Sequence, residues 1–177
     1  MHLILSVIWL FTPAGVANMA PIIFNRLPFL DVPIDFGRTW KGKPIFGSHK
    51  TYRGFVVGVI MAVGTAYLQK ILYPHFESLS LIDYSQINVV WLGLLQGFGA
   101  LGGDLVKSFV KRRLNIPSGQ SWIPFDQTDA IFGALFLTSF MLDLNPQQII
   151  VAVLTFGLLH PLANLLGYIL KFKQSKV

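Results

Sequence analysis

The sequence predicts an all-α integral membrane protein, a bundle of five transmembrane helices with one polar site facing the cytoplasm. Composition carries part of this prediction, because 53% of the 177 residues are hydrophobic and only 12% are charged. So few polar side chains cannot cover the surface of a soluble globule. The chain length suits a single membrane-embedded domain, residues 1–177. The chain has no cysteine, which excludes disulfides and thiolate catalysis.

Five apolar runs separated by polar loops carry the rest of the prediction. Four of them reach the roughly 17 residues that a helix needs to cross the hydrocarbon core. The fourth run has only 13 residues, 130–142, before Asp143. Its polar start should therefore lie below the membrane surface, in a cavity open to water. The expected spans are 3–27, 55–73, 87–110, 130–142 and 149–170, and the first lacks the leading Lys or Arg of a signal peptide.

The basic residues orient this bundle. Thirteen of the 14 Lys and Arg residues, all except Lys70, fall on the side that holds loops 28–53 and 111–127 and the C-terminus. The positive-inside rule makes that side cytoplasmic and leaves the N-terminus outside the cell membrane. Because the net charge of +6 follows membrane sidedness, we expect no nucleic-acid partner.

Asp104 lies at the end of an apolar run, where a carboxylate costs free energy unless it has a partner or a function. On a helix, Ser108 at i+4 and Lys111 at i+7 share its face, with Arg112 beside them. This face would offer cations suited to phosphate. An ordinary cytoplasmic anchor is the alternative reading of the basic cluster 111–113.

Asp126 and Asp129 are spaced i, i+3 at the start of the fourth run. If they face Asp104, the three carboxylates line a pocket suited to Mg²⁺. Two structural alternatives remain open. The pair also suits a helix N-terminus, as a cap and a first-turn carboxylate, and Asp104 could simply pair with Lys107 or Lys111.

The loop 28–53 combines cations with glycines and aromatic residues. Glycines allow backbone N–H groups to approach phosphate oxygens, and aromatic rings offer stacking faces for a base. A solvated loop held inside by its positive charge explains the same composition. The candidate nucleotide-binding residues of this loop are Arg38, Trp40, Lys41, Lys43 and Lys50.

The residues at the centre of the chain resemble a known family, the CTP-dependent phosphatidate cytidylyltransferases, which carry Ser-x2-Lys-Arg and, further on, Asp-Arg-x-Asp. The sequence lacks the family's His-Gly-Gly segment, has Gln127 in place of the Arg, and has no Lys-Asp pair after the basic cluster. The shorter form is similar to the archaeal branch of CDP-archaeol synthases. The matching pattern is Asp104-x3-Ser108-x2-Lys111-Arg112, then Pro124 and Asp126-x2-Asp129.

The resemblance implies an enzyme of membrane phospholipid biosynthesis that transfers CMP from CTP to a lipid phosphate and releases pyrophosphate. The branch implies 2,3-bis-O-geranylgeranylglycerol 1-phosphate, an isoprenoid ether lipid in the bilayer, as acceptor and a CDP-archaeol precursor as product. It implies Mg²⁺ as the cofactor, on Asp104, Asp126 and Asp129. The implied catalytic residues are these aspartates with Lys111 and Arg112, while Ser108 joins the loop residues in nucleotide binding.

Two other functions stay open from the residues themselves. The run Gly103-Asp104-x2-Lys107 resembles acyl-phosphate glycerol-phosphate acyltransferases, although their glycine-lysine phosphate loop is missing. A small cation transporter could use the buried aspartates as its ion path. Such a short transporter would need to dimerise, so a homodimer is also open.

Overall fold

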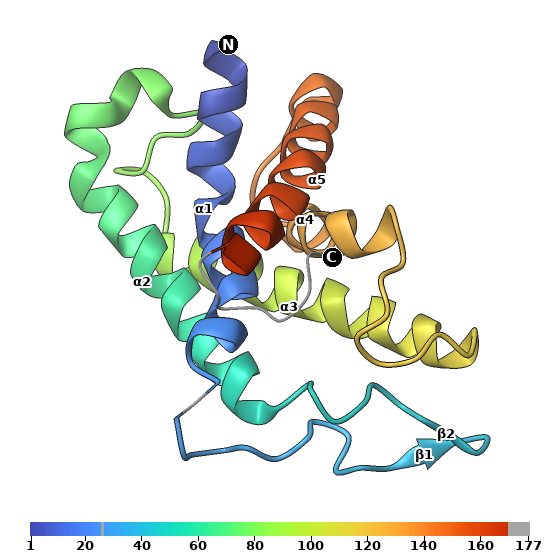
Figure 1. Ribbon diagram of the computed structural model, residues 1–177. Coiled ribbons are helices and arrows are strands. Elements are labelled where there is room, and N and C mark those ends of the chain that lie inside the picture. The colour runs from blue at the N-terminus through green and yellow to red at the C-terminus, as the bar shows by residue number, and fades with distance from the viewer. Residues whose placement is uncertain (26, 170–177) are drawn as a thin grey trace.

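The protein is a bundle of helices with one small β-hairpin, as the computed structural model of residues 1–25 and 27–169 shows (Figure 1). Among the residues that the structure describes, three helices are long and apolar enough to cross a membrane, α1, α2 extended by the short helix η1, and α3. The elements are α1 (His2–Ile23), β1 (Thr39–Trp40), β2 (Lys43–Pro44), α2 (Tyr52–Phe76), η1 (Glu77–Leu79), α3 (Val89–Arg113), α4 (Phe125–Thr138) and α5 (Pro146–Ile169).

The two remaining helices, α4 and α5, have apolar stretches shorter than those of the three candidate spans. α4 has 14 residues, and the apolar stretch of α5 among the residues searched is Pro146–Leu159. The sequence placed the start of the fourth run at Ala130, but α4 begins at Phe125. Asp126 and Asp129 therefore lie inside the helix. The sequence analysis missed this start because the first turn is polar and does not extend the apolar run. The C-terminal residues 170–177 lie outside the described part of the chain.

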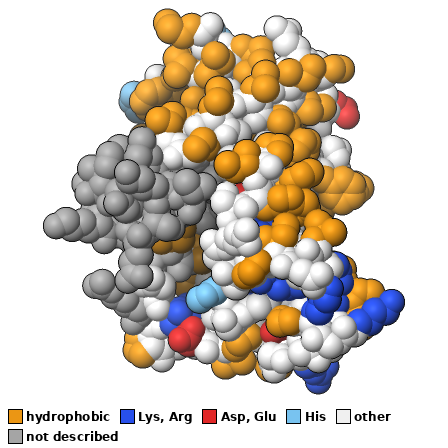
Figure 2. Space-filling model, turned by 45° about the vertical axis from the view of Figure 1, so that its right-hand side comes forward, with side chains coloured by type: hydrophobic (Ala, Val, Ile, Leu, Met, Phe, Trp, Pro, Cys, Tyr) orange, Lys and Arg blue, Asp and Glu red, His pale blue; other side chains and the backbone are white. Residues whose placement is uncertain are grey.

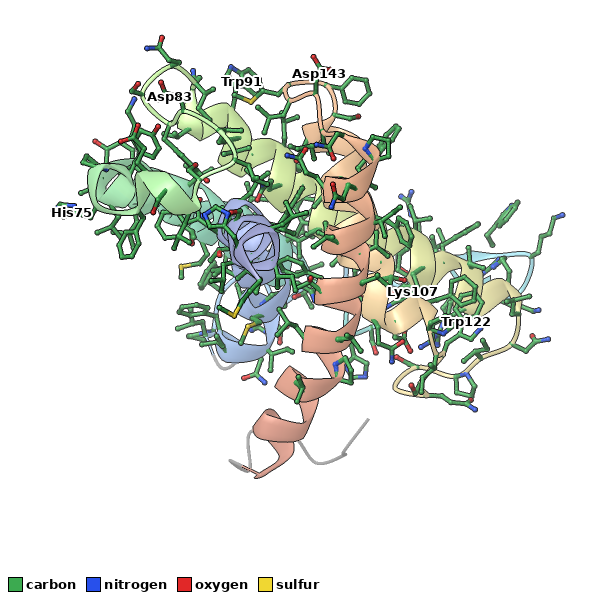
Figure 3. All side chains as sticks on the ribbon, turned by 90° about the horizontal axis from the view of Figure 1, so that it is seen from above. His75, Asp83, Trp91, Lys107, Trp122 and Asp143 are labelled. Carbon is green, nitrogen blue, oxygen red and sulfur yellow. The ribbon has the colours of Figure 1, made fainter. Side chains whose placement is uncertain are left out.

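α1 lies at the centre of the bundle and contacts α2, α3, α4 and α5 (Figure 3). Its buried residues include Leu10, Phe11, Ala14 and Ala17. Pro13 lacks an N–H group, so the carbonyl of Trp9 has no helical donor. Gln69 Nε2 of α2 donates to this carbonyl, and Gln96 Nε2 of α3 donates to the next one, Leu10 O, at 2.9 Å.

α3 and α4 pack backbone against backbone, because glycines stand where they cross. A Cβ added at Gly103 would collide with the carbonyl of Asp129, and one at Gly99 would collide with the backbone of Gly133. Such close contact between helices requires small residues on both sides. The glycines thus bring the start of α4 against the last turns of α3.

The loop 28–53 contains a β-hairpin that the sequence did not predict. β1 and β2 pair antiparallel through a two-residue turn, and both turn residues, Lys41 and Gly42, have positive φ (51° and 74°), as the turn favoured in such hairpins requires. The buried Asp35 fastens the base of the hairpin, accepting hydrogen bonds from the N–H groups of Gly37, Phe46 and Gly47. Burial raises the pKa of Asp35, but these N–H donors outweigh it and hold the pKa below its ordinary value.

Arg113, at the end of α3, holds this hairpin against the bundle. Its guanidinium donates to the carbonyls of Trp40, Lys43 and Pro44, while Lys43 Nζ donates back to Arg113 O at 3.0 Å. The Trp40 ring stacks on Phe109 with centroids 5.5 Å apart. Arg113 is therefore a structural clamp for the loop, where the sequence suggested only a membrane anchor.

In Figure 2 the visible basic side chains gather toward one end of the molecule, and hydrophobic side chains are dense toward the other end. The order of the helices puts the loops 28–53 and 114–124 at this basic end and the loops 80–88 and 139–145 at the other. The candidate site residues all belong to the basic end.

Candidate active site

Lys107 of α3 lies at the point where the three aspartates singled out in the sequence meet. Its Nζ is 3.0 Å from Asp104 Oδ1, 3.0 Å from Asp126 Oδ1 and 2.8 Å from Asp129 Oδ2. Asp104 is one turn earlier on α3, and the other two come from the first turns of α4. The four side chains are 7–16% exposed. Three carboxylates therefore surround one positive charge.

Two more lysines extend this network. Lys111 Nζ lies 3.1 Å from both carboxylate oxygens of Asp126 and also donates to the carbonyl of Gln120. Lys50, from the loop that leads into α2, pairs with Asp104. Three lysines thus match three aspartates, and this formal balance limits the cost of placing ionised groups away from water.

Asp126 does not serve as the helix cap that the sequence left open. The N-cap of α4 is Pro124, and no side chain caps this end. The Asp126 carboxylate accepts instead from the N–H of Trp122, in the preceding loop, and from Lys111. Lys107 and Trp122 lie on the same side of the molecule in Figure 3. The carboxylate therefore ties the loop before α4 to α3.

The other predicted site residues have different surroundings. Ser108 is buried on α3, and the side chains of Trp40 and Lys43 are engaged with the end of α3. Lys41 Nζ lies 5.1 Å from the centroid of the Trp40 ring. Among the described residues, none forms an ion pair with Arg38, Lys41 or Arg112, and Arg112 Nε is buried without a hydrogen-bond partner. The backbone N–H groups expected to face phosphate are partly taken by Asp35.

Lys107 is the site residue that the sequence analysis missed, because it entered there only as a partner for Asp104. The spacing of the charged residues on α3 could have indicated its position. Lys107 is i+3 from Asp104 and i−4 from Lys111, so all three lie on neighbouring positions of one helix face.

An apolar groove of about 590 Å³ opens between α3 and α4 beside this network. Four phenylalanines line it, Phe98, Phe125, Phe132 and Phe136, and each is 45–65% exposed. Lys107 and Asp129 are the charged residues of its lining. The groove therefore joins apolar walls suited to hydrocarbon with a cluster of ionised groups.

The carboxylates suit a divalent metal in chemistry, since hard oxygen ligands are those that Mg²⁺ prefers. They already gather around one cation, the ammonium group of Lys107. Among the described residues, no three acidic or histidine side chains stand ready as a metal site. The donor set therefore fits a divalent cation in its chemistry, and in this structure the ammonium group of Lys107 lies at its centre.

Comparison with known proteins agrees with this architecture. A family model described as CarS-like, CDP-archaeol synthase, matches residues 1–176. The chain is 36% identical to a CDP-archaeol synthase of Pyrococcus furiosus, with 98% of both chains covered. It is 34% identical to one of Pyrobaculum arsenaticum, with 96% of this chain and 94% of that one covered.

A solved structure extends the likeness to three dimensions. It is described as an intramembrane enzyme for archaeal membrane lipids biosynthesis, and it matches with a TM-score of 0.75 and 28% identity over 92% of this chain and 94% of that one. These matches argue against the acyltransferase and the transporter. The chain belongs to the CarS-like CDP-archaeol synthase family.

Proposed function

We propose that this CTP-dependent cytidylyltransferase of membrane-lipid synthesis transfers CMP to a lipid phosphate at the junction of α3 and α4. The acceptor would be 2,3-bis-O-geranylgeranylglycerol 1-phosphate, an isoprenoid ether lipid. The observation that supports this site is the meeting of the ionic network with the apolar groove, since Lys107 and Asp129 belong to both. A reaction between a water-soluble nucleotide and a membrane lipid needs such a boundary.

In the proposed reaction, an oxygen of the lipid phosphate attacks the α-phosphorus of CTP. A new P–O bond forms, the bond between the α- and β-phosphates breaks, and pyrophosphate leaves with the electron pair. The attacking oxygen is already ionised, so the protein needs no nucleophilic side chain. The rate would come from positioning and from stabilising charge on the phosphates.

Each group of side chains has a task in this proposal. Asp104, Asp126 and Asp129 hold the divalent cation, Mg²⁺, which neutralises phosphate charge when bound. Lys111 and Arg112, in the last turn of α3, act on the phosphates. The hairpin loop closes over the nucleotide with Arg38, Lys41 and Lys50, while Phe132 and its neighbours contact the lipid chains.

We further propose that all five helices cross the cell membrane, with the N-terminus outside and the basic end in the cytoplasm, where CTP is found. The 14-residue α4 would start below the membrane surface. The division of Lys and Arg between the two ends supports this orientation. Single cysteines at Ser48 and Ser78 should be labelled from opposite sides, and labelling of both from one side would contradict it.

Pyrophosphate release by the purified protein tests the reaction. With Mg²⁺ and CTP, the ether lipid phosphate should support release, and phosphatidic acid should support some, because apolar walls discriminate by only about 1–3 kcal/mol per misfitted methylene group. Release with phosphatidic acid alone would contradict the acceptor. Release with neither lipid would contradict the proposal.

A further inference from the structure

Lys107 has an unusual share of the charge in this network. Its single ammonium group contacts all three carboxylates, whereas Lys50 contacts only Asp104 and Lys111 only Asp126. Lys107 is also the only one of the three that reaches Asp129, whose side chain is 7% exposed. Without Lys107, at least one buried carboxylate would have no cationic partner among the described residues.

The side chain also has room to leave. Lys107 lines the groove of about 590 Å³ together with Val106, Val110 and Phe132, and its stem lies along apolar walls. A lysine stem packs well against apolar surface while its ammonium group takes another position. By contrast, Lys111 is 8% exposed on its side chain and is held by the Gln120 carbonyl. Lys50 is more exposed, at 29%, and has a single ionic partner, but it does not line the groove. Lys107 is therefore the one lysine of the three with the groove beside it as a place to move into.

We propose that Lys107 is an internal counter-ion that holds the three aspartates together in the absence of metal and is displaced from them by the divalent cation. This inference rests on the proposed function only in that Asp104, Asp126 and Asp129 form the cation site. Three carboxylates in a dry environment repel one another and favour protonation or rearrangement. The ammonium group prevents both, so the empty site keeps its charges and its shape.

The proposal makes Lys107 and the metal competitors for the same carboxylates. Removing Lys107 should make the folded protein dependent on a divalent cation for stability, because the metal then supplies the only central positive charge. It should also tighten cation binding, since no bound group has to leave. A lysine with a merely structural role would lower stability equally with and without metal.

Thermal unfolding of the full-length protein in detergent, without CTP or lipid, tests this. Wild type and Lys107→Met, an apolar side chain of similar length, are compared in EDTA and over a Mg²⁺ titration. We expect the variant to melt lower than wild type in EDTA and to be rescued by Mg²⁺. Its apparent affinity, read from the rise of Tm with concentration, should be higher than that of wild type by about tenfold or more. Equal Mg²⁺ responses of the two proteins would overturn the proposal.

Two further variants keep the test decisive. Lys43→Met removes a lysine whose ammonium group bonds, within the described part of the chain, only the Arg113 carbonyl, so it should show no gain in Mg²⁺ dependence. If Lys107→Met alone does not fold in EDTA, the double variant Lys107→Met with Asp129→Asn should restore folding by removing one charge of each sign. Failure of that compensation would contradict the counter-ion role.

The same data separate this inference from the proposed function. If neither wild type nor Lys107→Met responds to Mg²⁺ or Mn²⁺, the three aspartates are not a cation site and the counter-ion proposal falls. Pyrophosphate release from CTP would still decide the transfer reaction independently. If release occurs and the two proteins respond equally to Mg²⁺, the function stands and the role of Lys107 falls.

Discussion

The polar side chains around α1 and those between α3 and α4 are built differently. Around α1, Gln69 and Gln96 donate hydrogen bonds to the carbonyls of Trp9 and Leu10, next to Pro13. All the partners are neutral, and both glutamines are at most 3% exposed. Between α3 and α4, ionised groups form the contacts instead, and they border an apolar groove.

The difference separates polar groups that complete the fold from those placed for chemistry. Each glutamine donates to a backbone carbonyl in the turn before Pro13, and Gln69 supplies the donor that Pro13 removes from Trp9, as any membrane-embedded backbone requires. The aspartates and lysines form ion pairs with one another, and burying such charges costs more than burying an apolar core of the same volume. A membrane protein keeps so costly a network where it has a task. Substitutions in the two groups should therefore affect activity and stability differently.

The largest effect should come from Asp126→Asn. The substitution removes one charge at constant shape, and loss of a metal ligand typically lowers activity by about 10–100-fold or more. Pyrophosphate release measures it, and circular dichroism should show an unchanged helical content. Full activity would place Asp126 outside the site, because its other role, accepting from the Trp122 N–H, survives as an amide oxygen.

Gly103→Ala should come next, because it forces apart the two helices that build the network. A Cβ here meets the carbonyl of Asp129, and overpacking costs about 1–3 kcal/mol of stability. Activity should fall by about tenfold or more, since a displacement of about 1 Å can cost ~100-fold. Gly64→Ala on α2 is the matched control, because nothing lies within 4 Å of a Cβ there. Equal effects of both substitutions would show that helix spacing is unimportant.

Gln69→Leu should show the opposite pattern, with stability lost and activity kept. The change leaves the Trp9 carbonyl without a donor, at a cost of about 1–3 kcal/mol, while the rate per folded molecule stays near that of wild type. Thermal unfolding and pyrophosphate release measure the two quantities. The exposed Gln147 forms no side-chain hydrogen bond with the described residues, so Gln147→Leu is the control. A large loss of rate in folded Gln69→Leu would erase the distinction between the two polar groups.

Arg113→Ala should have the smallest effect on the chemical step. It releases the hairpin from α3, so KM for CTP should rise several-fold while kcat changes little, and protease should cut the loop 28–53 faster. Arg112→Ala is the informative partner, because we propose that Arg112 acts on phosphate and expect kcat to fall. An unchanged KM in Arg113→Ala would mean that the clamp does not organise the nucleotide site.

Much of this fold could be predicted, because a membrane imposes long apolar helices that composition reveals directly. Asp104 could be singled out for the same reason, as a charge in an apolar run. The central position of Lys107 could not be derived, since it depends on how α4 is rotated against α3. That rotation follows from the glycine contacts at Gly99, Gly103 and Gly133, and sequence periodicity does not specify which helix each glycine meets.

The hairpin was missed for a different reason. Its strands have two residues each, too short for an alternating pattern, and the composition of the loop suggested phosphate contacts instead. The turn pair Lys41-Gly42 was its one local signal. The role of Asp35 depends on N–H donors eleven and twelve residues away, a distance at which no local rule applies.

The bonds around Pro13 have a consequence for how the protein is made. α1 emerges first from the ribosome, yet the donors for its carbonyls are Gln69 and Gln96, which lie 60 and 86 residues further along the chain from their acceptors. Until α2 arrives, water or the insertion machinery must satisfy the Trp9 carbonyl, which Pro13 leaves without a helical donor. α1 therefore cannot reach its final form in lipid alone, and a fragment that ends before α2 should be retained by the insertion machinery or degraded.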